Sequence, residues 1–266
     1  LFGNKTPQGG GYIAIIGAAA ACILSALVSY DYLTGDLYEA GMPYLVDMKW
    51  MIFGTFEVNF GIYIDGLSCI MMLFASFIST LIFVYSLGYM HDQEMRKRRY
   101  FAEVALFLTG MLGLAVSSSL LELFIFWEVM GLCSYLLIGF WSFRHPEGDD
   151  KADNAASAAK KAFLVTRLGD VCLMGGLFVL FFAMGSLDYT VVFNADKLAA
   201  AWAADSGKLL LAALLIFGGV IGKSAQFPLL DWLPDAMAGP TTVSALIHAA
   251  TMVKAGVYIV ARCFPL

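Results

Sequence analysis

Apolar residues occur along this chain in long blocks that short polar stretches separate. Each block holds about 20 residues, enough for a helix to cross the ~30 Å hydrocarbon core of a bilayer. Helices are expected because backbone groups in lipid must bond within their own segment, and the blocks lack the alternation of barrel strands. The pattern predicts an all-α polytopic membrane protein with seven transmembrane helices, at residues 11–29, 62–90, 100–117, 119–141, 158–185, 208–226 and 241–263.

Charges in the connections between these blocks alternate in sign. The connections at 90–100 and 142–160 are rich in Lys and Arg, whereas 30–61 and 186–207 carry few cations and several acids. Because cationic loops stay in the cytoplasm, we expect the first two connections to be cytoplasmic and the other two to face outward. A strand-like passage with Gly54 at a turn position predicts a short extracytoplasmic hairpin within the 30–61 connection and the residues that follow it. We expect residues 1–266 to form a single transmembrane domain.

Composition supports a membrane location and gives no support for nucleic-acid binding or a metal site. Hydrophobic residues make up 60% of the chain and charged residues 14%, against about 45–50% and about 25% in soluble domains. The net charge of −5 gives no support for nucleic-acid binding. The five cysteines are scattered through apolar segments, so we expect no metal site and interpret them as small buried hydrophobes.

The two ends of the sequence suggest a piece of a longer reading frame. The chain opens with "LFGNKTPQGGG", without an initiator Met or a signal peptide, and stops directly after an apolar run. We therefore expect a fragment, with a processed start as the alternative.

Charged side chains inside the predicted spans are the most informative feature, because one at mid-depth costs about 2.5–3.5 kcal/mol. Glu128 and Lys223 have no opposite charge in their own spans, so each requires a partner or water from another helix. That requirement favours a functional role for both residues. Arg167 and Asp170 are spaced i, i+3, which suits an ion pair within one helix. The spacing is equally compatible with a purely structural pair and with a pair that takes part in transport.

The last predicted span carries a polar stripe beside Lys254. Its members follow a helical spacing along one face: Thr241, Ser244, His248, Thr251 and Tyr258. Hydroxyls, an imidazole and an ammonium suit a file of water that carries protons, because histidine titrates near neutral pH. Ordinary hydrogen bonding between helices is the alternative for the stripe, and a lone histidine on an apolar helix is more often a satisfied core residue.

Three prolines, Pro228, Pro234 and Pro240, lie between the last two spans. Pro228 follows Lys223 by five residues within an apolar run, and a proline removes a backbone donor and clashes with the preceding turn. We therefore expect a helix broken at Pro228, as in transporters that place ion sites at discontinuous helices. The alternative is that Pro228 ends the span and a surface loop follows, with Pro240 in the first turn of the next helix.

Three long motifs resemble one family. "GKSAQFPLLDWLPDAMAGPTTVSALIHAATMVKAGVYIVAR", "FWEVMGLCSYLLIGFW" and "AKKAFLVTRLGD" are similar to the antiporter-like proton-pumping subunits of respiratory complex I, and to subunit L (NADH dehydrogenase subunit 5) in particular. The resemblance covers most of residues 60–264. It implies the first half of a fold built from two inverted five-helix repeats. Mrp-type cation/proton antiporters, membrane-bound hydrogenases and deazaflavin-linked archaeal dehydrogenases share this superfamily.

The resemblance also implies roles for individual residues. Glu128 would pair with Lys223 in the broken helix, Asp170 would lie near that pair, and His248 would relay protons toward the middle of the subunit. The predicted proton-translocation residues are therefore Glu128, Lys223, His248 and Lys254. Arg167 and Asp170 are predicted to form a supporting ion pair. Many L subunits have Thr where this chain has Lys254. A lysine at this position is more similar to Mrp-type and archaeal relatives, so the sequence does not identify the electron donor of the complex.

The predicted function is proton translocation by a membrane subunit of an NADH-quinone oxidoreductase in a prokaryotic cell membrane. We expect no cofactor or metal on this chain; NADH or another donor, quinone, flavin and iron–sulfur clusters would belong to partner subunits. The expected partners are those subunits, the bilayer and protons, with Na⁺ as the alternative ion. The rival functions are an Mrp-type Na⁺/H⁺ antiporter subunit, a membrane subunit of an archaeal dehydrogenase, hydrogenase or bicarbonate-uptake system, and a structural scaffold with inert ion pairs.

Overall fold

A computed structural model describes residues 7–53, 56–91, 96–143 and 150–266 of the chain. Within these ranges, seven helical segments are long and apolar enough to cross a membrane. The elements in chain order are η1 (Pro7–Gly10), α1 (Gly11–Thr34), α2 (Asp36–Glu39), β1 (Tyr44–Phe53), β2 (Phe56–Ile64), α3 (Gly66–Tyr89), α4 (Lys97–Val116), α5 (Leu120–Ile138), η2 (Gly139–Phe143), α6 (Asp150–Met184), α7 (Tyr189–Val192), α8 (Ala195–Lys223), α9 (Trp232–Asp235), η3 (Ala236–Ala238), α10 (Thr241–Ala245), η4 (Leu246–Ala250) and α11 (Met252–Arg262).

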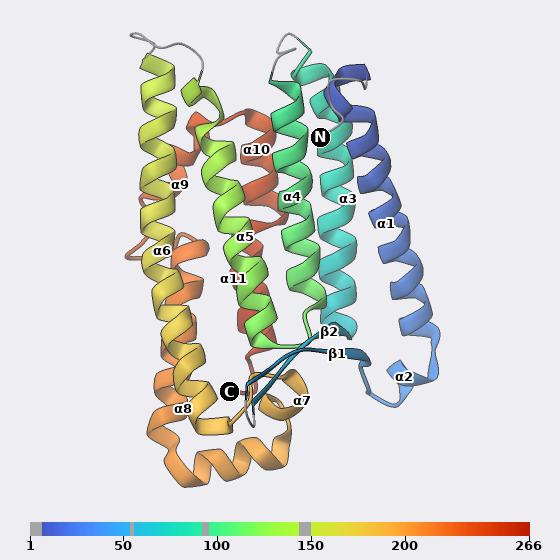
Figure 1. The fold of residues 1–266 in the computed structure, drawn as a ribbon, viewed down its shortest axis with the longest axis vertical. Coiled ribbons are helices and arrows are strands. Elements are labelled where there is room, and N and C mark those ends of the chain that lie inside the picture. Colours follow the sequence, from blue (N-terminus) through green and yellow to red (C-terminus); the bar gives the residue numbers. More distant parts are fainter. Residues whose placement is uncertain (1–6, 54–55, 92–95, 144–149) are drawn as a thin grey trace.

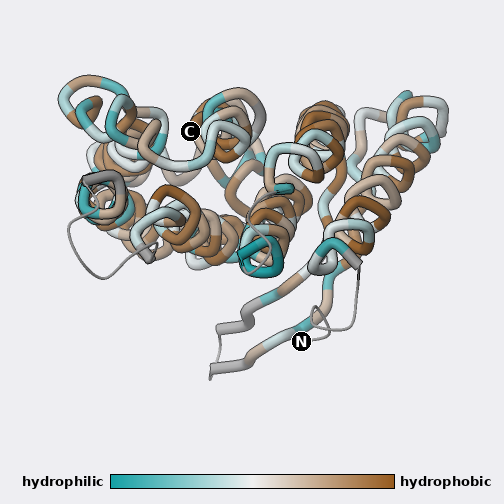
Figure 2. Tube along the Cα trace, turned by 90° about the horizontal axis from the view of Figure 1, so that it is seen from above, coloured by the Kyte–Doolittle hydropathy of each residue, from teal (hydrophilic) through white to brown (hydrophobic). Residues whose placement is uncertain are grey.

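The long helices stand side by side, with α1 at one edge of the bundle and α6 and α8 at the other (Figure 1). α3 packs against α1 and α4, α5 lies between α4 and α6, and α6 packs along α8. Seen along the bundle, hydrophobic residues predominate on the upright helices and hydrophilic residues gather toward their ends (Figure 2). This distribution is what a bilayer requires of a helical protein.

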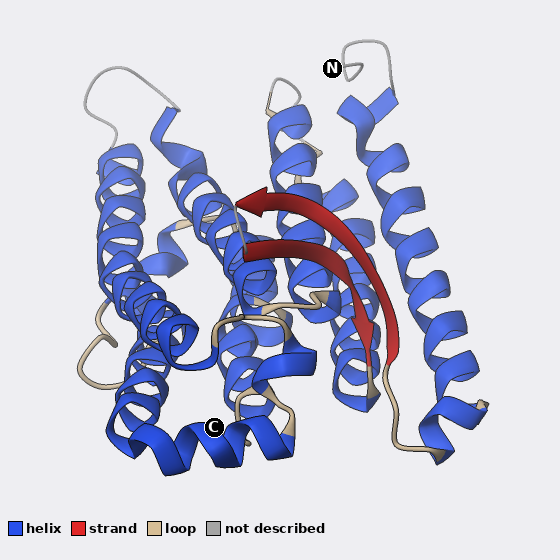
Figure 3. Ribbon diagram, turned by 60° about the horizontal axis from the view of Figure 1, so that its bottom comes forward, coloured by secondary structure: helices blue, strands red, loops and turns tan. Residues whose placement is uncertain are grey.

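The predicted spans correspond to these helices, but several ends differ. Residues 62–64 belong to strand β2, because α3 begins only after Asp65, whose carboxylate accepts a hydrogen bond of 2.9 Å from the Ser68 amide and caps the helix. α6 begins at Asp150, eight residues before the predicted start of its span. α8 begins at Ala195, within the predicted outward connection, and bends at Asp205 (φ −158°, ψ 84°). The part before the bend lies across the end of the bundle (Figure 3).

Strands β1 and β2 occupy the stretch in which a hairpin was expected. They pair antiparallel from Tyr44↔Ile64 to Phe53↔Phe56, and the expected turn at Gly54 lies outside the described residues. The ribbon arches across the end of the bundle at which α3 begins (Figure 3). The Gly61 amide donates to the Glu122 carboxylate of α5 at 3.2 Å, which ties the ribbon to the helices.

The helical path breaks directly after Lys223, five residues before Pro228. Residues 224–231 are not helical, and the short elements α9 and η3 follow before α10 begins. Residues 226–228 and 230–231 are exposed, so a surface loop follows the helix, as the alternative prediction had it; the loop ends at Trp232, which is fully buried and whose indole donates to the Gly222 carbonyl at 2.9 Å. The predicted interruption is therefore present, and the helix already ends one turn ahead of the proline. Pro240 occupies the N-cap of α10, one position before the predicted first turn.

The last span is not one regular α-helix. A π-helical turn, η4, separates α10 from α11, and Thr251 has non-helical dihedrals (φ −131°, ψ −89°). The Thr251 hydroxyl donates to the Leu246 carbonyl at 2.7 Å and satisfies a backbone acceptor that the wider turn exposes. The predicted stripe assumed a regular helix, so its members before and after the π turn do not follow one continuous α-helical face.

Candidate functional site

Lys223 is the last residue of α8, and its side chain is completely buried. Its Nζ lies 3.6 Å from Oδ2 of Asp170 on α6 and donates to the Trp127 carbonyl of α5 at 3.4 Å. The ammonium also lies 5.5 Å from the centroid of the Trp127 ring. A buried ammonium costs several kcal/mol unless charge and dipoles compensate it, and these three contacts supply that compensation.

Asp170 connects the three helices of the site. Its Oδ1 accepts a 2.6 Å hydrogen bond from the Trp127 indole, while its Oδ2 faces Lys223. Its side chain is only 3% exposed. The carboxylate is thus held from both sides, which fixes the position of the Lys223 ammonium.

Arg167 and Glu128 form the second ion pair of the site, between α6 and α5, in which Nη1 of Arg167 donates to Oε2 of Glu128. The Arg167 guanidinium also stacks over Phe163 at 4.8 Å from the ring centroid. This pair is less enclosed, because the Arg167 side chain is 39% exposed and that of Glu128 is 20% exposed. Oε1 of Glu128 is buried without a hydrogen-bond partner in the described part of the chain, so it requires a water or a proton.

The pairing differs from the expected one. Glu128 was expected opposite Lys223, with Arg167 and Asp170 paired along α6; instead Lys223 faces Asp170 and Glu128 faces Arg167. The i, i+3 spacing places Arg167 and Asp170 one turn apart on one face of α6, where each reaches a different helix. Glu128 and Lys223 still interact electrostatically across the cluster. Two acids and two bases therefore form one group whose formal charges cancel.

Gly131 is a site residue that the sequence analysis did not identify. A Cβ at this position would lie 2.5 Å from Nζ of Lys223, a distance that real contacts do not show. Gly131 therefore leaves the space that the ammonium occupies midway along α5. Its position one turn after Glu128 was the available signal.

We expect Gly131→Ala to displace the Lys223 ammonium and to destabilise the folded protein by about 1–3 kcal/mol, the usual cost of overpacking a filled interior. The change is measurable as a lower midpoint of thermal unfolding of the full-length protein in detergent. Gly175→Ala on α6 is the matched control, because its Cβ would make an ordinary 3.8 Å contact with Leu215. Equal midpoints for the two variants would contradict the assigned role of Gly131.

His248 and Lys254 lie apart from the charged cluster. His248 is half-buried in the π turn, and both of its ring nitrogens are buried without a partner among the described residues. Such nitrogens require water. Lys254 lies on the exposed side of α11. Ser224, next to Lys223, connects the two regions, because its hydroxyl donates to the Val253 carbonyl of α11 at 2.9 Å.

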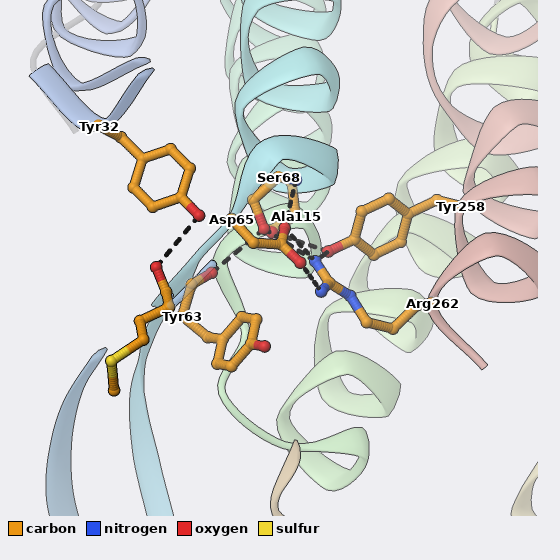
Figure 4. Close-up of polar contacts among 8 residues, drawn as sticks. Tyr32, Tyr63, Asp65, Ser68, Ala115, Tyr258 and Arg262 are labelled. Atoms are coloured by element: carbon orange, nitrogen blue, oxygen red, sulfur yellow. Dashed lines mark hydrogen bonds and ion pairs between the residues drawn. The ribbon is translucent and has the colours of Figure 1, made fainter. Parts of the chain in front are cut away.

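A second polar cluster joins the start of α3 to the end of α11 (Figure 4). The Arg262 guanidinium donates to both oxygens of Asp65, at 2.5 and 3.0 Å, and to the hydroxyls of Ser68 and Tyr258, at 2.9 and 2.7 Å. Tyr258 in turn donates to the Ala115 carbonyl of α4 at 2.9 Å. We call these five residues the Arg262 anchor. Only Tyr258 among them was singled out from the sequence.

Aromatic rings enclose the Arg262 anchor. The guanidinium lies 5.2 Å from each ring centroid of Tyr63, Tyr189 and Tyr258. Burial raises the pKa of Asp65, but the hydrogen bonds and charge of Arg262 and the Ser68 amide outweigh it and hold the pKa below its ordinary value. The anchor is therefore a bidentate ion pair that fixes the end of α11 against α3 and the ribbon.

Family models match two parts of the chain. Residues 117–266 match the model described as "NADH:quinone oxidoreductase/Mrp antiporter, TM", and residues 50–101 match "NADH-Ubiquinone oxidoreductase (complex I), chain 5 N-terminus". The first match includes every residue of the charged cluster and both His248 and Lys254. The second includes the end of β1, all of β2 and α3, and the start of α4.

Several curated proteins are similar over nearly the whole chain. F(420)H(2) dehydrogenase subunit L of Methanosarcina mazei is 45% identical over 100% of this chain and 39% of that protein. NAD(P)H-quinone oxidoreductase chain 5 of a Synechocystis strain is 42% identical over 92% and 35%, and the chloroplast subunit 5 of Chara vulgaris is 42% identical over 96% and 36%. The chain thus spans less than two fifths of the length of these relatives.

Solved structures share the arrangement of helices. The Mrp complex from Dietzia sp. DQ12-45-1b contains a chain with a TM-score of 0.73 and 28% identity, covering 95% of this chain and 26% of that one. A chain of the membrane-bound sulfane sulfur reductase, an archaeal respiratory membrane complex, has a TM-score of 0.77 at 20% identity and covers 98% and 48%. The second likeness concerns the fold alone.

Proposed function

The chain belongs to the NADH:quinone oxidoreductase/Mrp antiporter transmembrane family, and we propose that it forms a proton-transfer half-channel in a membrane subunit of a complex I-like oxidoreductase. One observation carries this proposal: a completely buried lysine, Lys223, shares a neutral four-charge cluster with Asp170, Arg167 and Glu128 at a break in a transmembrane helix. A scaffold needs neither a buried ammonium nor a helix break at the same place. Each is costly, and together they provide a site that can hold and release a proton.

The proposed chemistry is the exchange of one proton at Nζ of Lys223. Two unit charges 4 Å apart interact by about 4 kcal/mol at an effective dielectric near 20. Moving one carboxylate toward or away from the ammonium therefore changes its proton affinity about a thousandfold. Glu128 is the movable partner, because its side chain is partly exposed and one of its oxygens is unpaired, whereas Asp170 is held by Trp127.

The proton would leave Lys223 in two successive transfers, first to water and then to His248. When Glu128 binds Arg167, the ammonium of Lys223 retains only Asp170 and gives its proton to a water at the helix break, leaving a neutral amine. His248 would accept that proton on a ring nitrogen, since both nitrogens lack a protein partner among the described residues. Lys254 would take part in onward transfer from the exposed side of α11.

Redox chemistry in this proposal belongs to other subunits. The similar proteins are named as subunits of F(420)H(2) dehydrogenase and of NAD(P)H-quinone oxidoreductases, so a donor, a quinone, flavin and iron–sulfur clusters would act in the partners of this chain. The chain would then be part of an enzyme only within the assembled complex. In the described residues, no three His, Cys, Asp or Glu side chains are grouped closely enough to hold a metal ion.

A second candidate is a subunit of an Mrp-type Na⁺/H⁺ antiporter. The likeness to a chain of the Dietzia Mrp complex favours it, and the same charged cluster would serve. Proton transport driven by quinone reduction would support the first candidate. Proton transport that occurs only when a Na⁺ gradient drives it would support the second.

We expect Glu128→Gln in the full-length protein to lower redox-driven proton transport by tenfold or more, because a neutral amide cannot change the proton affinity of Lys223. The assay is acidification of proteoliposomes that contain the assembled complex. Glu39→Gln is the matched control, since Glu39 is exposed on α2, outside the cluster. If Glu128→Gln transports protons as well as the control, the ion pairs are structural and the proposal is wrong.

A further inference from the structure

Trp127 lies inside the charged cluster and contacts both members of its buried ion pair. The Trp127 indole donates to Oδ1 of Asp170 at 2.6 Å, and the Trp127 carbonyl accepts from Nζ of Lys223 at 3.4 Å. The centroid of its ring lies 5.5 Å from the same ammonium, and the whole side chain is buried. One residue of α5 therefore contacts both the acid of α6 and the base of α8.

The ion pair between Asp170 and Lys223 is open. Its Nζ–Oδ2 distance of 3.6 Å is too long for a hydrogen bond, whereas an ammonium bonded directly to a carboxylate lies about 2.7–2.9 Å from it. The short bond of Asp170 is the one from the Trp127 indole. The indole thus holds the carboxylate short of direct contact with the ammonium.

The ammonium is held on the other side of this gap, again by α5. The Trp127 carbonyl binds Nζ of Lys223 beside Gly131, where a Cβ would lie only 2.5 Å from that nitrogen. One turn of α5 therefore fixes both sides of the gap. The indole of Trp127 positions the acid, and its carbonyl positions the base.

We propose that Trp127 is a positioning residue that keeps the ion pair between Asp170 and Lys223 open, so that Lys223 can release its proton. This inference rests on the proposed function. In the release step the ammonium becomes a neutral amine and a water molecule becomes hydronium, while Asp170 is the carboxylate that still attracts the proton. Closing the gap from 3.6 Å to about 2.8 Å would raise the proton affinity of Lys223 about tenfold at an effective dielectric near 20.

The other charges near Lys223 do not depend on the Trp127 indole. Two further charged side chains act on the ammonium, Glu128 from α5 and Arg167 from α6, and they pair with each other. α11 also packs against α8, but one of its two cations is exposed and the other belongs to the Arg262 anchor. Removal of the indole donor therefore changes the pair of Lys223 with Asp170.

The test measures redox-driven proton transport by the assembled complex in proteoliposomes as a function of pH. Trp127→Phe keeps an aromatic ring but removes the donor, so Asp170 can close on Lys223. The pH of half-maximal transport should then rise by about one unit, because a proton bound tenfold more tightly leaves only at a tenfold lower proton concentration. A residue needed only for packing would lower the rate at every pH and leave this midpoint in place.

Three further variants separate the donor from the bulk of the side chain. Trp232→Phe makes the same change at another fully buried tryptophan, but its indole bonds the uncharged Gly222 carbonyl, so the midpoint should stay in place. In an Asp170→Asn background, Trp127→Phe should shift the midpoint no further, because the carboxylate through which it acts is absent. If Trp127→Phe does not fold, benzothienylalanine at position 127 preserves the size of the ring system without its donor and should give the same shift.

The outcomes distinguish this inference from the proposed function. An unchanged midpoint in Trp127→Phe, together with loss of transport in Lys223→Arg, would overturn the inference and leave the proposed function in place. An equal shift in Trp232→Phe would assign the effect to packing and would also overturn it. Transport at the natural rate by Lys223→Arg would overturn the proposed function and this inference with it.

Discussion

Lys223→Met in the full-length protein is expected to reduce proton transport by at least tenfold and to destabilise the folded state by about 3–5 kcal/mol. Transport fails because methionine carries no proton. Stability falls because Asp170, only 3% exposed, then remains as a buried carboxylate whose hydrogen bond from the Trp127 indole is its one remaining hydrogen bond from a side chain in the described part of the chain. Proteoliposome acidification and the thermal unfolding midpoint measure the two effects.

A double variant separates the two effects. Adding Asp170→Asn to Lys223→Met removes the unpaired charge and keeps an acceptor for the Trp127 indole, so most of the lost stability should return while transport stays absent. Recovery of transport together with stability would mean that Lys223 is needed only for folding.

The second large effect is expected at the Arg262 anchor. Arg262→Gln removes both hydrogen bonds to Asp65 and leaves a partly buried carboxylate without its cation, which should cost about 2–3 kcal/mol of unfolding free energy. The unfolding midpoint of the full-length protein in detergent measures the loss. Lys254→Gln on the same helix should change it by less than about 0.5 kcal/mol, because that side chain is exposed.

The anchor also predicts a pH dependence. Because the pKa of Asp65 is lower in the folded protein than its ordinary value of 3.8, the ionised carboxylate stabilises the fold at all higher pH. This contribution is lost as the pH falls through the lowered pKa, that is, below about pH 4. The measurement is the unfolding midpoint of the Asp65→Asn variant and of the natural protein as the pH is lowered. If both midpoints fall equally steeply, the assignment to Asp65 is wrong.

The helices could be predicted because hydrocarbon imposes a length and an internal hydrogen-bond pattern on every apolar block. The predicted family resemblance is likewise confirmed by the family model that matches residues 117–266. The ends of the helices were harder to predict, because they depend on individual caps. Asp65 delays the start of α3, and Asn194 starts α8 early by accepting hydrogen bonds from the Asp196 and Lys197 amides at 3.1 Å.

The charged residues of the candidate site could be found from the sequence, but their partners could not. Apolar surroundings single out Glu128 and Lys223, and helical spacing suggests a pair between Arg167 and Asp170. Which carboxylate reaches which cation depends on the rotation of α5, α6 and α8 about their axes, which no spacing within one helix determines. For the same reason Gly131 was missed, since its importance is the space it leaves for a side chain from another helix.

The π turn around His248 was also beyond sequence reasoning. The run from Thr241 to Arg262 contains no proline or internal charge cluster that would signal it, and one extra residue in a turn changes the helical face of everything after it. The stripe was predicted for a regular α-helix, and the π turn separates the faces on which His248 and Lys254 lie. Their role in a proton relay stays a prediction.

Whether Lys223 gives up its proton during transport is decided by the Lys223→Arg variant of the full-length protein. Arginine keeps the positive charge beside Asp170 but does not deprotonate in proteins. At equal rates of quinone reduction in proteoliposomes, we expect this variant to transport protons as poorly as Lys223→Met, although its complex is folded. Proton transport by Lys223→Arg at the natural rate would contradict the claim.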